Sequence, residues 1–172
     1  MRTSLAPLLV LALAAPAYAD GDEPASKTEG PRAVDKGTLG VGLMIGEPVG
    51  VCARLYVQDD QAIQGALGAA FIGGGFQLHA DYVFHPYILQ TRDSFVLATY
   101  VGPGVRVIDY TGGSNQSDFV ALGVRAVGGL LFDFKNPLDA FVEVAGIGEF
   151  AFKSGEGFGL AINVAAGVRY YF

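Results

Sequence analysis

The alternation of apolar with small or polar residues at the C-terminus is the feature that most constrains the fold. Counted back from the last residue, every second position of 158–172 is apolar: Phe172, Tyr170, Val168, Ala166, Val164, Ile162, Leu160 and Phe158. The positions between them are small or polar, and include Arg169 and Asn163. Because successive side chains of a β-strand point to opposite faces, this segment is predicted to be a strand with one wholly apolar face.

The same period of two recurs along most of the chain. Residues 39–46, 49–57 and 76–85 alternate cleanly, and 62–72, 95–108, 119–132 and 138–150 follow the pattern less closely. Turn signals rich in Gly, Pro, Asn and Asp separate these segments. Gly makes up 25 of the 172 residues, which disfavours helices. We therefore expect an all-β chain whose eight antiparallel strands form an up-and-down meander, closed into a barrel that leaves no exposed edges.

The two faces of this predicted barrel indicate which solvent surrounds it. Charged side chains share their face with many Gly and Ala residues, whereas the opposite face holds Leu, Val, Ile and Phe. Small residues fit the narrow interior of an eight-stranded barrel. The bulky apolar face then lies outside, where lipid is the solvent and barrel closure satisfies every backbone group. The alternation favours a transmembrane barrel over a soluble barrel with an apolar interior.

The N-terminal region predicts export. Arg2, an apolar run over 5–15 and the small-residue site Ala17-Tyr18-Ala19 are typical of a signal peptide cleaved before Asp20. We expect residues 1–19 to be this signal peptide, 20–37 to be a charged, disordered leader, and 38–172 to be the barrel. The single cysteine, Cys52, permits no internal disulfide and is expected to be a small packed residue.

The C-terminal strand also carries a resemblance. Its alternation through Tyr170 to a terminal Phe172 resembles the signature of bacterial outer-membrane barrels, in which this strand is the signal read by the barrel-assembly machinery. Residues 38–172 resemble small eight-stranded barrels such as the OmpA transmembrane domain and OmpX. The segments 42–50, 123–125, 137–143 and 167–172 are similar to a family of predicted outer-membrane barrels of unknown function. The resemblance implies an outer-membrane location and a monomer in contact with membrane lipids, and it supplies no activity.

The charged face of the strands is expected to close the barrel interior. Eight strands leave room for side chains, and aqueous channels need about sixteen. An unpaired charge in such an interior is costly, so we expect an ion-pair network formed by Arg54, Asp81, Arg106, Arg125, Glu143 and Arg169. Asp139 and Glu149 are further carboxylates near strand ends. The network acts either as structural filling or as a gate that rearranges.

The sequence argues against one further function class and leaves another open. The formal net charge of −6 argues against nucleic-acid binding. A lipid-modifying enzyme is the alternative to a structural or interaction role, because His79 and Asp81 share one strand face and can pair. Such a site also needs a nucleophile, and the candidates Ser94, Ser114, Ser117 and Ser154 lie in no recognisable motif. His79 and His85 are too far apart along a strand to share one metal ion. We therefore predict a non-enzymatic protein and assign no catalytic residue, metal site or cofactor.

Overall fold

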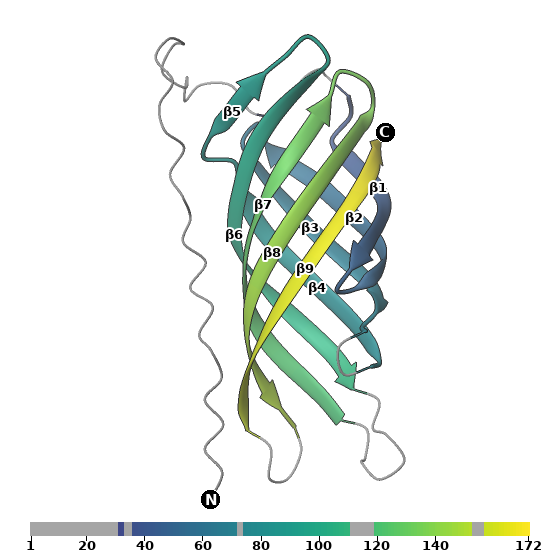
Figure 1. The fold of residues 1–172 in the computed structure, drawn as a ribbon, viewed down its shortest axis with the longest axis vertical. Coiled ribbons are helices and arrows are strands. Elements are labelled where there is room, and N and C mark those ends of the chain that lie inside the picture. Colours follow the sequence, from purple (N-terminus) through teal and green to yellow (C-terminus); the bar gives the residue numbers. More distant parts are fainter. Residues whose placement is uncertain (1–30, 33–35, 72–73, 111–118, 153–156) are drawn as a thin grey trace, which may run out of the picture.

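A computed structural model of the chain describes residues 31–32, 36–71, 74–110, 119–152 and 157–172. These residues form nine strands (Figure 1). Within the same residues, no helix is long and apolar enough to span a membrane. The predicted signal peptide and most of the predicted leader lie outside the described residues.

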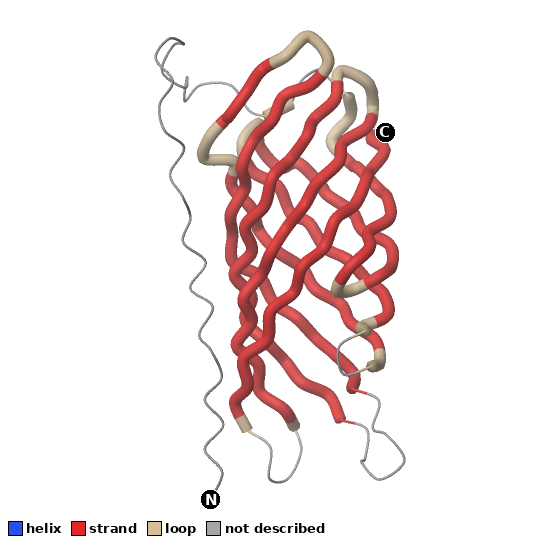
Figure 2. Tube along the Cα trace, in the orientation of Figure 1, coloured by secondary structure: helices blue, strands red, loops and turns tan. Residues whose placement is uncertain are grey.

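Eight of the nine strands form a closed antiparallel barrel, which confirms the fold predicted from the period of two. Strand β1 pairs with β9, and β4 pairs with β6 where the barrel closes. The wall of crossing strands can be followed in Figure 2. The eight barrel strands are β1 (Leu39–Gly46), β2 (Val49–Gln58), β3 (Gln61–Ala69), β4 (Phe76–Phe84), β6 (Phe95–Tyr110), β7 (Phe119–Phe134), β8 (Leu138–Ala151) and β9 (Phe158–Tyr171).

The ninth strand, β5 (Ile88–Thr91), lies outside the closed ring and pairs only with β6. Its residues fall in a segment that the sequence predicts as a turn. Pro86 lacks an N–H group and fixes φ, so the ladder that β4 forms with β6 is interrupted there. The chain then rejoins β6 near residues 96–98. Three of the four side chains of this short strand are exposed. Its residues show no alternation of apolar and polar side chains from which the strand could be predicted.

The alternation of exposed and buried residues follows the predicted faces. In β9, Val164 is 63% exposed, and its neighbour Ala165 is 5% exposed. Large exposed hydrophobic residues occur on the outer face of every barrel strand. The inner face holds the charged residues together with small and aromatic ones.

Interior glycines make room for large aromatic rings. A Cβ at Gly40 would lie 2.7 Å from the ring of Tyr171, and one at Gly129 would lie 2.5 Å from the ring of Tyr100. Both rings are buried in the main apolar cluster of the interior. The high glycine content therefore serves interior packing as well as turns.

The barrel wall is uneven in height. Strands β6 to β9 have 14 to 16 residues, whereas β1 to β4 have 8 to 10. Strand β1 ends at Gly46, which pairs with Ala165 of β9. The first residues of β9, from Phe158 onward, pair with β8 and extend beyond the end of β1. The taller half of the wall therefore projects at the end of the barrel away from the C-terminus (Figure 1).

Candidate functional site: the charged interior of the barrel

All six charged residues predicted to line the interior are buried there. Arg54, Asp81, Arg106, Arg125, Glu143 and Arg169 are each at most 6% exposed. They come from six different strands, because each occupies an inward position in the alternation of its own strand. They do not form one network. Their contacts divide into three clusters, which we call the central, C-terminal and distal clusters.

The central cluster is built around Arg125 of β7. Its Nε lies 3.0 Å from Asp81 Oδ1, and its Nη2 donates to Glu143 Oε1 at 2.5 Å. Gln64 donates to both carboxylates, at 3.4 Å to Asp81 and 3.1 Å to Glu143, and Tyr100 donates to Glu143 at 2.8 Å. One guanidinium thus bridges two buried carboxylates, an arrangement that suits the fork geometry of Arg.

Arg54 belongs to the predicted network, yet no contact among the described residues joins it directly to Asp81 or Glu143, which both pair with Arg125. Its guanidinium donates to the amide oxygen of Gln64, lies 3.4 Å from His85 Nε2 and sits 4.6 Å from the centroid of the Tyr100 ring. Gln64 therefore links Arg54 to the two carboxylates. The other ring nitrogen of His85, Nδ1, donates to the Asp60 carbonyl at 3.0 Å, so Nε2 is the acceptor for Arg54.

The C-terminal cluster pairs Arg169 with Asp139 rather than with Asp81 or Glu143. Arg169 Nε lies 3.0 Å from Asp139 Oδ1, and its Nη2 donates to Oδ2 at 3.1 Å. Tyr171 donates to the same carboxylate at 2.6 Å. The ring of Phe141 lies under the guanidinium, 4.2 Å from its centre. Two parallel hydrogen bonds and an aromatic face hold this cation in one orientation.

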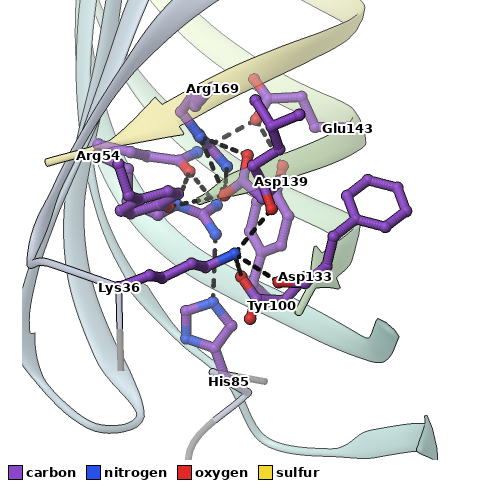
Figure 3. Close-up of polar contacts among 12 residues, drawn as sticks. Lys36, Arg54, His85, Tyr100, Asp133, Asp139, Glu143 and Arg169 are labelled. Atoms are coloured by element: carbon purple, nitrogen blue, oxygen red, sulfur yellow. Dashed lines mark hydrogen bonds and ion pairs between the residues drawn. The ribbon is translucent and has the colours of Figure 1, made fainter. Parts of the chain in front are cut away.

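Lys36, a residue of the predicted leader, closes the same end of the barrel. Its Nζ lies 2.6 Å from a carboxylate oxygen of Asp133. It also donates to the carbonyls of Phe134, Asn136 and Leu138 at 2.7 to 3.3 Å. Figure 3 shows this ammonium group beside Asp133 and the Arg169–Asp139 pair. No sequence signal marks Lys36, because the short charged segment around it has no period.

The distal cluster lies at the opposite end of the barrel. Arg106 donates to Glu149 at 2.7 Å, to Tyr110 at 2.8 Å and to Asn163 Oδ1 at 3.1 Å. Tyr110 donates to the other oxygen of Glu149 at 2.8 Å. Glu149, expected only as an additional carboxylate, is therefore the charged partner of Arg106.

The carboxylates closest to His79 are already bound within the central cluster. His79 Nε2 lies 3.9 Å from Asp81 Oδ2, farther than Arg125 does. His79, Asp81 and Glu143 bring possible ligand atoms within 4.8 Å of one another, yet Arg125 and Gln64 bind both carboxylates. A cation would have to displace the guanidinium. Of the candidate nucleophiles, Ser94 is exposed in the β5–β6 turn, and the other three serines lie outside the described residues.

The two residues of the predicted assembly signal lie on the outer face. Tyr170 and Phe172 are both exposed, and their rings contact edge to face with centroids 5.1 Å apart. The Phe172 amide donates to the Leu39 carbonyl at 3.0 Å. Cys52 is a free, buried thiol of the interior.

Comparison of the chain with protein-family models, with curated proteins and with solved structures finds no match.

Proposed function

We propose that this protein is a small, monomeric outer-membrane β-barrel whose role is structural or interactive and whose interior is plugged. The observation that carries the proposal is the inversion of the usual polarity: large apolar side chains cover the outer face of every barrel strand, while the charged residues are inside. Soluble monomers rarely expose apolar patches above a few hundred Å². An apolar outside with a polar inside is typical of transmembrane barrels.

The three clusters support a closed interior. In the central cluster, Gln64 of β3 donates to Glu143 of β8 on the opposite side of the ring. Near the two ends, Arg169 joins β9 to the neighbouring strand β8, and Arg106 joins β6 to β8. Eight strands leave an interior that side chains fill. Of the two roles considered for the network, structural filling suits these contacts better than gating does, because each central carboxylate has more than one partner.

The export and assembly features complete the proposal. A cleaved signal peptide delivers the chain to the periplasm, the barrel-assembly machinery reads the C-terminal strand with Tyr170 and Phe172, and outer-membrane lipids surround the finished barrel. The resemblance to the OmpA transmembrane domain and OmpX supports the same location. Lipid modification by His79 and Asp81 has weaker support, because Arg125 and Gln64 already bind Asp81.

Fractionation, gel migration, bilayer conductance and lipid hydrolysis test this function. The protein should fractionate with outer membranes and migrate faster on gels when it is not boiled, since a closed barrel resists unfolding by detergent. Refolded into planar bilayers, it should give no steady conductance. Recovery of folded protein in the soluble periplasmic fraction would contradict the location, and a stable open channel would contradict the plugged interior. Hydrolysis of lipid A or phospholipid that is abolished by His79→Ala would support the lipid-modifying enzyme instead.

A further inference from the structure

The wall of the barrel has a gap at its distal end, beside the first half of β9. Strand β1 stops opposite Ala165, so residues 158–163 of β9 have no β1 residue beside them. In Figure 1, β9 continues below the end of β1. A crevice of about 440 Å³ lies at this gap and is lined by Glu47, Arg106, Tyr110, Glu149 and residues 160–163. Its volume is within the range of about 300–1,000 Å³ that is usual for small-molecule sites.

The crevice joins the inner face of the wall to the outer face. Ala161 and Asn163 occupy inward positions of β9, and Asn163 is buried. Leu160 and Ile162 occupy outward positions and are 83% and 68% exposed. All four residues line the same crevice. A ligand bound there therefore contacts polar groups of the interior at one end and the apolar exterior at the other, which favours an amphipathic molecule.

Two hydrogen-bond donors of the crevice have no acceptor among the described residues. They are Arg106 Nε and Asn163 Nδ2, and both side chains are 3% exposed. The terminal nitrogens of Arg106 donate to Glu149, to Tyr110 and to the amide oxygen of Asn163, which holds the two side chains against each other. Buried donors in folded proteins normally have partners, so these two groups favour a ligand that supplies oxygen acceptors.

The neighbouring polar groups favour an acceptor that is uncharged and has no proton to donate. Glu149 accepts from Arg106 at one oxygen and from Tyr110 at the other, and the Tyr110 hydroxyl accepts from Arg106. Glu47 accepts from the Phe71 amide, and we assign it no contact with the ligand. Because Arg106 and Glu149 lie 2.7 Å apart and neutralise each other, the pair offers no surplus positive charge to an anion. A carbonyl oxygen meets both conditions.

An acyl ester combines an uncharged acceptor with an apolar chain, and the crevice fits both parts. We propose that the distal crevice binds the ester group of a membrane lipid. Its carbonyl oxygens accept from Arg106 Nε and Asn163 Nδ2, and its acyl chain lies against Leu160 and Ile162. Such a ligand gives a chemical class to the interaction role proposed above, and it is within reach only in a membrane, so the proposal rests on that location. The contacts between Arg106 and Glu149 hold the donor in place before the lipid arrives, which lowers the entropic cost of binding.

The side-chain N–H resonances of Arg106 and Asn163 report directly on this contact. Isotope-labelled protein is refolded in dodecylphosphocholine micelles, whose detergent contains no ester. It is titrated with diheptanoyl phosphatidylcholine and with the dialkyl ether analogue, which has the same head group and no carbonyl oxygens. Methyl acetate supplies a carbonyl without a chain, and inorganic phosphate supplies an anion. We expect saturable shifts of both resonances with the diacyl lipid, and binding of the other three probes that is weaker by about tenfold or more.

Two pairs of variants locate the binding in the crevice. Asn163→Ala removes one donor and should weaken binding of the diacyl lipid about tenfold. Gln77→Ala, which changes another buried amide with one unpartnered atom, should leave it unchanged. Leu160→Ala removes part of the surface against which the acyl chain lies and should weaken binding about threefold or more. Leu43→Ala, at an exposed outward position of β1 outside the crevice, should have no effect.

Several results would overturn the proposal. Equal binding of the diacyl lipid and its ether analogue would mean that the carbonyl oxygens play no part, and equal binding of methyl acetate would mean that the chain plays none. Shifts with phosphate alone, or no saturable shift with any probe, would also overturn it, and the wild-type resonances decide this even if a variant does not fold. Insertion into vesicles is measured on the same preparation. A barrel that inserts without binding the ester refutes only this inference, whereas a failure to insert refutes the proposed location.

Discussion

Replacing Asp139 by Asn isolates the contribution of one buried ion pair to the stability of the barrel. Arg169 and Asp139 form two hydrogen bonds with each other and are almost wholly inaccessible to solvent. The substitution keeps the shape of the side chain and removes its charge, so the buried guanidinium of Arg169 loses its carboxylate partner while the Phe141 ring stays beneath it. Breaking a buried pair from one side costs about 3–5 kcal/mol. We expect a loss of that size in the free energy of unfolding.

The double variant Asp139→Asn/Arg169→Gln separates this pairing from the loss of packing. With both charges removed, no unpaired ion remains, so the double variant should be more stable than Asp139→Asn by well over the ~0.5 kcal/mol error of additivity. The measurement is urea unfolding in lipid vesicles, followed by tyrosine fluorescence and read as midpoint and slope. The exposed turn residue Asp59 supplies a control, and Asp59→Asn should stay within about 0.5 kcal/mol of wild type.

A double variant that is less stable than Asp139→Asn would refute the reasoning. It would mean that Arg169 contributes mainly through its contacts with other groups and that the charge of Asp139 is not its counterpart. A loss that vanishes at high salt would also contradict the account, because a buried pair is little screened by ions.

Three further perturbations test separate parts of the structure. Glu143→Gln should destabilise the barrel by about 2 kcal/mol or more in the same urea assay. Adding Arg125→Gln should recover little of this loss, because Asp81 then also loses its guanidinium partner. Full recovery in the double variant would contradict the bridging role of Arg125. Lys36→Met should lower stability by about 2 kcal/mol or more, since it removes an ammonium group that lies 2.6 Å from Asp133 and donates to three backbone carbonyls. An unchanged unfolding midpoint would show that the closing contact is not formed. Deleting Phe172 should reduce the heat-modifiable, membrane-inserted fraction in cells, while normal assembly would refute its part in the signal.

The fold could be predicted from the sequence because strand periodicity is a local signal. Every inward position of β9, such as Asn163 and Arg169, follows from counting by two along the chain. The extra strand β5 has no such signal, since its four residues are nearly all exposed and only its backbone pairs with β6. The strand count of the closed ring was therefore predictable, whereas this addition was not.

The site could be predicted only as a set of residues. Alternation places Arg106 and Arg125 inside, but it does not say which carboxylate lies at the same height on another strand. The pairing of each Arg with a carboxylate depends on the register between neighbouring strands. This register places Arg125 near Asp81 and Glu143, and it places Arg106 near Glu149. Lys36 was missed because it enters the barrel end from a segment without periodicity, where no pattern links it to Asp133.

The most direct test of the central claim is the cost of a charge on the outer face. Val164 is largely exposed at an outward position of β9, and Ala165 beside it is buried inside. In lipid vesicles, Val164→Arg should lower the free energy of unfolding by about 2–4 kcal/mol if it lies near the bilayer midplane, as should Val124→Arg on β7, and Ala165→Ser should be nearly silent. A water-facing position would tolerate Arg within about 0.5 kcal/mol. Such tolerance at Val164 and Val124 would contradict a lipid-facing exterior and would favour a soluble barrel.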